Sequence, residues 1–163
     1  MRRVQPGRYT AKIDGPFVVF LIGMRINKLH RPDKWLPVAM AMPPMLKTLQ
    51  EHPEKGFMGG ESFLYWRGVA LAQYWRSFED LERFASEPSD PHRKPWQRFN
   101  KAVGTGGLVG IWHETFKVEA GSYECVYGNM PVFGLAAATT HVPAVGQLER
   151  ARTRIERLRA PAE

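Results

Sequence analysis

A continuous run of apolar and largely β-branched residues, FVVFLIGMRI at 17–26, predicts a central strand that is covered on both faces. Further apolar positions recur at helical spacing, at Trp35, Val38, Ala39 and Met42. This row predicts a helix that Asp33 caps and that the tandem prolines at 43 and 44 kink or break. The methionines near these prolines fit either a core helix or the apolar wall of a ligand pocket.

The segment ESFLYWRGVALAQYWRS at 61–77 is rich in aromatic and β-branched residues. It predicts two strands or one bent hairpin, with the break near Arg67 and Gly68. Ser77 and Asp80 then have the spacing of a capping box, so we expect a helix over FEDLERFA. Pro88 ends that helix, because the residue before a proline disfavours helical geometry.

The segment from Pro88 to Val118 predicts a short helix, a glycine-rich turn and a strand. Asp90 and Pro91 suit the start of the helix, and Gly104 suits its end. One face of this helix carries a row at steps of four, three and four: His92, Trp96, Phe99 and Val103. The run LVGIWHETFKV then predicts a strand that contains His113. Two histidines on neighbouring elements can therefore face one cavity.

The ends of the chain are less regular. We expect residues 1–15 to form an irregular lead-in and YECVYGNM to form a strand with Tyr123, Cys125 and Tyr127 on one face. Residues 131–146 show no clear period and predict a loop, whereas the basic segment from Gln147 predicts a helix.

The predicted order is strand, helix, two strands, helices, strand, which is the βαββαβ pattern of a ferredoxin-like α+β half-barrel. An extra C-terminal strand and a helical tail follow it. The helices cover one face of the sheet, and a second copy commonly covers the other, so we expect a homodimer that forms a dimeric α+β barrel. We assign residues 1–147 to this single domain and residues 148–163 to a basic helical tail.

The composition adds three constraints. The formal net charge is +7, but much of the excess lies near the two ends and no nucleic-acid-binding motif accompanies it, so we do not expect nucleic-acid binding. No segment has the apolar length needed to span a bilayer. A single cysteine, Cys125, suits a reducing cytoplasmic compartment, and we expect it to be a small buried strand residue.

Three motifs of this chain resemble a known family: YWRSFEDLERFA, GIWHETFKV and YECVYGNMPVFGL. They are similar to dimeric α+β-barrel proteins, in particular to a bacterial and fungal domain family of originally unknown function that includes a monooxygenase of fumagillin biosynthesis. The resemblance covers roughly residues 15–140, and its most specific part is IWHE followed by GNMP. It implies monooxygenase chemistry on a small, largely apolar organic substrate.

The same region also resembles the C-terminal half of haem-containing aldoxime dehydratases. In those enzymes a helical histidine binds the iron, and a second histidine, in a WHE segment 21 residues later, acts on the distal side. His92 and His113 are also 21 residues apart, and His113 lies in Trp112-His113-Glu114. This resemblance implies haem b bound by His92, with His113 as the distal acid or base. Trp96, Phe99 and Trp112 would then cover the porphyrin.

The leading interpretation is a haem-dependent enzyme of monooxygenase type. Three alternatives stay open: a haem-dependent aldoxime dehydratase-like lyase, a cofactor-independent monooxygenase, and a non-catalytic ligand-binding or interaction module. In the cofactor-independent case, His113, Trp112 or Asn129 would only orient the substrate. In the last case, the basic tail would bind a partner.

Overall fold

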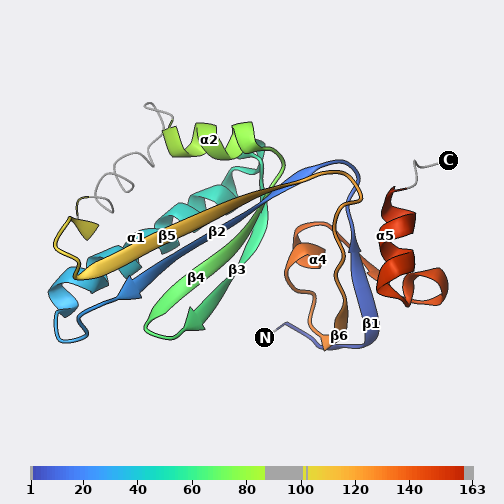
Figure 1. Ribbon diagram of the computed structural model, residues 1–163, viewed down its shortest axis with the longest axis horizontal. Helices are drawn as coiled ribbons and strands as arrows, with labels where there is room; N and C mark the ends of the chain where they lie inside the picture. The colour runs from blue at the N-terminus through green and yellow to red at the C-terminus, as the bar shows by residue number, and fades with distance from the viewer. Residues whose placement is uncertain (1, 87–100, 102, 160–163) are drawn as a thin grey trace.

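A computed structural model describes residues 2–86, 101 and 103–159 of the chain (Figure 1). Its elements include both strands and helices. In chain order they are β1 (Gln5–Lys12), β2 (Phe17–Ile26), α1 (Pro32–Glu51), the short 3-10 helix η1 (Pro53–Lys55), β3 (Phe57–Tyr65), β4 (Gly68–Trp75), α2 (Phe78–Ser86), β5 (Val109–Val118), β6 (Tyr127–Met130), α4 (Leu135–Ala138), β7 (Thr140–Pro143), the 3-10 helix η2 (Gly146–Leu148) and α5 (Ala151–Arg159).

Four of the strands form an antiparallel sheet in the order β3-β4-β2-β5. The segment from β2 to β5 therefore runs strand, helix, strand, strand, helix, strand, with its first and third strands at the centre of the sheet. This topology confirms the predicted ferredoxin-like α+β fold. The predicted strand at 17–26 coincides with β2, and the predicted hairpin at 61–77 corresponds to β3 and β4.

Helices α1 and α2 both pack on one face of this sheet, which we call the helix face. Alternate residues of β2 point to it, because successive side chains of a strand point to opposite faces. Val18 packs with Leu49 of α1 and Leu81 of α2 in one buried cluster. Met24 packs with Val38 of α1 and Val109 of β5 in a second one. The two clusters hold the helices against the sheet at its two ends.

The described residues cover the opposite face of the sheet, the open face, only at one end. Phe17 of β2 lies there in a buried cluster with Ala11 of β1 and Leu135 and Ala136 of α4. Strand β1 belongs to a second, three-stranded sheet with the order β6-β1-β7, which stands beside the main sheet in Figure 1, and α4 lies in the chain between β6 and β7. Glu61 of β3 joins the two parts, since its carboxylate accepts hydrogen bonds from Arg2 and from the Gly134 N–H.

Three predictions about the ends of the chain are wrong, and the second sheet explains them. Residues 5–12 form β1 rather than an irregular lead-in, because β1 pairs with both β6 and β7. The strand near Cys125 begins only at Tyr127, so Cys125 precedes it and is half-buried. The expected loop at 131–146 contains α4 and β7, since β7 completes the same sheet.

The predicted break in α1 is also wrong, because the helix is continuous from Pro32 to Glu51. Pro43 and Pro44 are exposed, so the carbonyl groups that lose their N–H partners there can meet solvent instead. The predicted cap of α2 is confirmed by a hydrogen bond of 3.0 Å from the Asp80 N–H to Ser77 Oγ.

Helix α5 is fastened to the rest of the chain by one buried arginine. Arg154 is only 3% exposed and donates hydrogen bonds to the carbonyl oxygens of Leu148 (2.7 Å) and Glu149 (2.8 Å). Its guanidinium also forms an ion pair with the carboxylate of Glu124. The basic C-terminal segment therefore packs against the loop that precedes β6.

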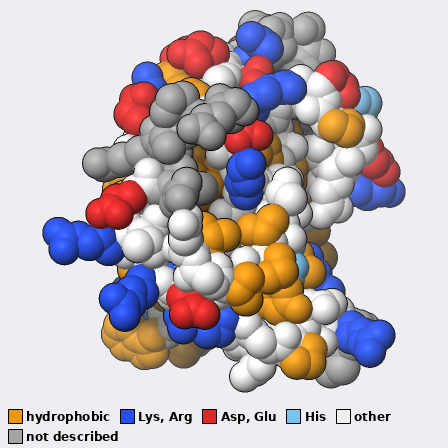
Figure 2. Space-filling model, turned by 90° about the vertical axis from the view of Figure 1, so that its right-hand side faces the viewer, with side chains coloured by type: hydrophobic (Ala, Val, Ile, Leu, Met, Phe, Trp, Pro, Cys, Tyr) orange, Lys and Arg blue, Asp and Glu red, His pale blue; other side chains and the backbone are white. Residues whose placement is uncertain are grey.

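No helix in the described part of the chain is long and apolar enough to cross a membrane. The assignment to the cytoplasm stays a prediction. Figure 2 shows the side of the molecule that carries β1 and α5, where lysine and arginine side chains stand apart with acidic side chains among them. The expectation that the net charge does not reflect a nucleic-acid site also stays a prediction.

The tyrosines around the junction of the two sheets predict how stability depends on pH. Burial raises the pKa of Tyr74, Tyr123 and Tyr127 above the ordinary value of 10.0. A raised pKa in the fold means that ionisation favours the unfolded chain, so stability is unchanged by these groups below about pH 10 and falls above it. Urea unfolding from about pH 8 to about pH 11 should show this fall, with a smaller slope in Tyr127→Phe. Equal slopes in the wild type and in Tyr127→Phe would contradict the contribution of Tyr127 to this fall in stability.

Candidate functional site

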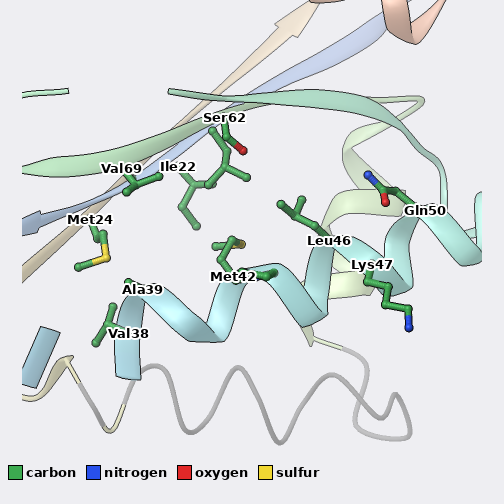
Figure 3. A pocket seen from close by; sticks show the side chains of 13 residues that line it. Ile22, Met24, Val38, Ala39, Met42, Leu46, Lys47, Gln50, Ser62 and Val69 are labelled. Carbon is green, nitrogen blue, oxygen red and sulfur yellow. The ribbon is translucent and has the colours of Figure 1, made fainter. Parts of the chain in front are cut away.

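A cavity of about 360 Å³ lies between α1 and the helix face of the sheet (Figure 3). This volume falls within the range of small-molecule sites. Most of the lining is apolar, and it comes from α1, β2, β3 and β4. The lining residues are Ile22, Gly23, Met24, Val38, Ala39, Met42, Pro43, Leu46, Lys47, Gln50, Ser62, Val69 and Leu71.

The two walls of the cavity follow from the spacing of their residues. On α1, Ala39, Met42 and Leu46 are three and four residues apart, so they lie on one face of the helix. On the sheet, Ile22 stands directly opposite Leu71, and Met24 stands directly opposite Val69. All four sheet residues point toward α1, and the side chains of the two walls leave space between them.

Among the described lining residues, the charged and amide side chains lie at one end of the cavity, and the Ser62 hydroxyl lies beside Ile22 nearer the middle. Figure 3 shows Gln50 and Lys47 at one end, and Met24, Val38 and Val69 at the other. The Lys47 ammonium is exposed and lies 3.7 Å from the Glu51 carboxylate. Within the described part of the chain, no hydrogen bond engages the side chain of Gln50 or Ser62, so both can bind a polar group of a ligand.

His113 lies on the helix face, like the cavity, but does not line it. Its position on β5 stands directly opposite Ile22, so both side chains point to the same face. The ring of His113 is exposed, and its centre lies 5.7 Å from that of Phe20. His113 therefore belongs to the side of the sheet on which the predicted site was placed, and its catalytic role stays a prediction.

Trp112 points to the other side of the sheet. Its indole lies against Gly23, where a β-carbon would approach the ring to 2.6 Å, and its Nε1–H donates to Tyr65 Oη at 3.0 Å. Tyr65 Oη in turn donates to the carbonyl oxygen of Met24 at 2.8 Å. A group bound in the cavity cannot reach Trp112. Its predicted contact with a cofactor stays a prediction that would require a cofactor on the open face.

The other predicted cofactor residues, His92, Trp96 and Phe99, lie outside the described residues. Val103, the last member of their predicted row, is described and helical. It packs against the buried cluster that contains Met24 and Val38, two residues of the cavity lining. Among the residues that the structure describes, no group of three or more histidine, cysteine, aspartate or glutamate side chains could hold a metal ion.

The structure also reveals site residues that the sequence did not single out as a set. Met42 belongs to the methionines for which an apolar pocket wall was one interpretation, and it does line the cavity. Met40 is exposed and Met45 is buried in the core, so the same interpretation does not hold for them. No sequence signal distinguished Gln50 and Ser62, because isolated polar residues of this kind are common at surfaces.

Comparison with known proteins identifies relatives of this chain. The sequence profile of the monooxygenase af470-like family matches residues 17–135. Monooxygenase af470 of Aspergillus fumigatus is 28% identical over 151 residues, which cover 79% of this chain and 53% of the fungal protein. The chain thus spans about half the length of the curated relative that it matches.

One solved structure is also similar. It is a conserved protein of unknown function and possible oxidoreductase from Bacteroides thetaiotaomicron, with 14% sequence identity and a TM-score of 0.41. The match covers 62% of this chain and 96% of that protein. All thirteen residues that line the cavity lie within the segment that matches the family profile.

Proposed function

The chain belongs to the monooxygenase af470-like family, and from this we propose that it is a monooxygenase acting on a small, largely apolar organic molecule bound beneath α1. The observation that supports this most is the cavity, which lies within the family segment and has a mostly apolar lining with a few hydrogen-bonding groups. An apolar molecule with one polar group would place that group near Gln50 or near Ser62. Its apolar body would lie against Ile22 and Met42.

Monooxygenation also defines what the test must measure. One atom of dioxygen enters the product and the other leaves as water, so two electrons come from the substrate or from an added reductant. The purified protein is given a panel of small apolar phenols, ketones and polyenes with isotope-labelled dioxygen. We expect one labelled atom in the product of at least one substrate. If substrates bind but no label is incorporated with or without reductant, the protein is a ligand-binding module.

For the cofactor, we propose haem b. His92 would hold the iron, Trp96 and Phe99 would cover the porphyrin, and His113 would accept or donate a proton at an imidazole nitrogen. When bound, haem supplies the activation of dioxygen. Two observations are compatible with this: His113 lies on the helix face, and Val103 packs beside the cavity.

Haem retention provides the first prediction about the site. The protein expressed with haem supply should show a strong Soret band at roughly 400 nm. His92→Ala should lose this band, because the His92 imidazole is the proposed axial ligand. His113→Ala should keep the band and lose most turnover. The absorption spectra are compared at equal protein concentration. Full haem retention in His92→Ala would contradict the assignment of His92 as the iron ligand. Turnover of an aldoxime by the wild-type protein under reducing conditions would instead indicate dehydratase chemistry.

Cofactor-free oxygenation is the second candidate, and one observation favours it. None of the described residues that line the cavity is a histidine or a cysteine, so these residues offer no imidazole or thiolate ligand for haem iron. A colourless protein that incorporates labelled oxygen without added haem would establish this chemistry.

Asn129, predicted above as a residue that could orient the substrate, accepts a hydrogen bond from the Gly7 N–H and so connects β6 to β1.

We also propose that the enzyme is a homodimer that covers the open face. Beyond the part covered by the second sheet, this face exposes aromatic side chains, namely those of Phe63, Tyr65, Trp112 and Phe116. An apolar surface of this kind is typical of a subunit interface.

Replacing one open-face residue by a charge tests the dimer. Phe116→Glu should shift the mass measured by light scattering from dimer to monomer, because a charge buried at an interface without a partner is costly. The control is Val145→Glu, another exposed apolar position outside this face, which should leave the mass unchanged. A monomeric wild-type protein at all concentrations would contradict the proposal.

A further inference from the structure

The tip of the β3–β4 hairpin exposes two large apolar side chains. Leu64 is 87% exposed and Trp66 is 74% exposed, more than any other large hydrophobic residue in the described part of the chain. Leu64 stands directly opposite Val69, which lines the cavity, so the exposed tip begins beside the apolar end of the cavity. Neither side chain contributes to the buried clusters of the fold.

The tip is held against the end of β2 by main-chain and side-chain contacts. The Ile26 N–H donates to the carbonyl oxygen of Arg67 at 2.7 Å, and Arg67 Nη2 donates to the carbonyl oxygen of Asn27 at 2.8 Å. The guanidinium of Arg25 stacks over the Trp66 ring at 5.0 Å. The loop between β2 and α1 adds another exposed apolar side chain, Leu29. Leu64 points to the helix face and Trp66 lies over Arg25 of the open face, so the two side chains lie on opposite sides of the tip. We call Leu29, Leu64 and Trp66 together the tip patch.

The charges around the tip patch are nearly all positive. Residues 25–34 and 62–68 contain five basic side chains and one acidic side chain. The basic ones are Arg25, Lys28, Arg31, Lys34 and Arg67, and the acidic one is Asp33. Asp33 pairs with Arg31 and Lys34, so it neutralises part of the charge and leaves an excess of cations beside the exposed leucines and tryptophan.

We propose that the tip patch binds an anionic lipid surface. Leucine and tryptophan side chains enter the boundary between lipid headgroups and acyl chains, and lysine and arginine beside them are attracted to anionic headgroups. Tryptophan under an arginine suits this boundary, because its ring is apolar and its indole N–H is polar. A second copy of the chain fits this end less well, because the cations of the two copies would repel each other.

Binding in this way would bring the apolar end of the cavity close to the lipid. An apolar molecule dissolved in the membrane could then enter between α1 and the hairpin without crossing water. This consequence rests on the proposed function, whereas the lipid binding itself does not. The test therefore measures binding alone, and its result is independent of any turnover.

The experiment is flotation of the full chain with vesicles of phosphatidylcholine alone and of phosphatidylcholine mixed with phosphatidylserine. We expect binding to the mixed vesicles that weakens as salt is raised, since salt screens the attraction between charges. The double variant Leu64→Ser/Trp66→Ser should bind at least tenfold more weakly. Lys28→Gln should weaken binding about fivefold, the effect of one basic residue near an anionic membrane.

Val145→Ser is the matched control, because Val145 is also strongly exposed but lies between β7 and η2. It should bind like the wild type, and all variants should melt at the wild-type temperature. Wild-type protein that fails to float at low salt would overturn the proposal, as would a double variant that floats equally well. A double variant that changes the oligomeric state in solution would instead assign the tip patch to contacts between copies, and would also overturn it.

Discussion

Replacing Ala39 by phenylalanine is expected to abolish turnover while leaving the fold intact. Ala39 lies on the face of α1 that lines the cavity, toward the end where Met24 and Val38 lie (Figure 3). A benzyl group at this position would occupy much of the cavity and exclude the substrate. We expect the rate of labelled-oxygen incorporation to fall by about 100-fold or more, because even small displacements of a bound substrate reduce rates on this scale.

The stability of this variant should change little, because the added ring enters existing space and increases apolar burial. An overpacked core commonly costs about 1–3 kcal/mol, and the cavity should keep the change in the free energy of unfolding at the lower end of that range. Urea unfolding measures this change, and circular dichroism measures the secondary structure. Both are needed, because lost activity with lost structure would say nothing about the cavity.

Met40→Phe provides the control on the neighbouring residue of the same helix. Met40 is 62% exposed and does not line the cavity, so its replacement adds a similar ring on the solvent side. It should retain the wild-type rate. If Ala39→Phe also retained the wild-type rate, the substrate would bind elsewhere, and the aromatic open face would become the first place to search.

The main sheet could be predicted from the sequence because each of its elements has a strong local pattern. The run at 17–26 is apolar apart from Arg25, which fits a central strand with α1 on one face and, at its start, the second sheet on the other. The strand of 109–118 is rich in β-branched and aromatic residues, and the hairpin at 57–75 is rich in aromatic residues. The order of these elements then leaves few topologies.

The second sheet could not be predicted in the same way. The segment QPGRYTAK of β1 contains a proline and a glycine and lacks a clear alternation of apolar residues. It becomes a strand because β6 and β7, more than a hundred residues later, supply hydrogen bonds to both of its edges. Pairing between backbone groups leaves little trace in the side chains, so a local pattern does not show it.

The cavity was only partly accessible to sequence reasoning. Ala39 and Met42 have the same spacing as core residues, and whether they touch the sheet or leave space depends on the side chains opposite them. The sequence does not fix the face of the sheet on which His113 lies, because that face depends on the pairing of His113 with Ile22. A shift of β5 by one residue would place Trp112 on the helix face and His113 on the open face. The cofactor predictions centre on His92 and stay predictions.

Removing Arg154 is the change with the largest expected effect on stability. Its guanidinium is buried, forms an ion pair with Glu124 and donates to the carbonyl oxygens of Leu148 and Glu149. Arg154→Met would keep much of the side-chain volume but leave a carboxylate and two carbonyl groups without these donors. Breaking a buried ion pair typically costs about 3–5 kcal/mol, and the partial exposure of Glu124 favours the lower end of that range.

We expect Arg154→Met to lower the melting temperature and to speed amide hydrogen exchange in α5 and in the loop before β6. Arg152→Met is the control on the same helix. Arg152 is 91% exposed and pairs with Glu156 only at 3.8 Å, so its loss should change the free energy of unfolding by less than about 0.5 kcal/mol. Equal effects of the two substitutions would show that the net charge of α5 matters rather than the buried contact.

A second substitution separates the two costs that Arg154→Met combines. In Arg154→Met/Glu124→Gln the unpaired carboxylate is replaced by a neutral amide, so the penalty of the uncompensated charge disappears while the two carbonyl groups still lack their donors. The double variant should therefore be more stable than Arg154→Met alone, although less stable than the wild type. If the double variant is no more stable than Arg154→Met, the ion pair contributes little. In that case the hydrogen bonds to Leu148 and Glu149 are what hold α5 in place.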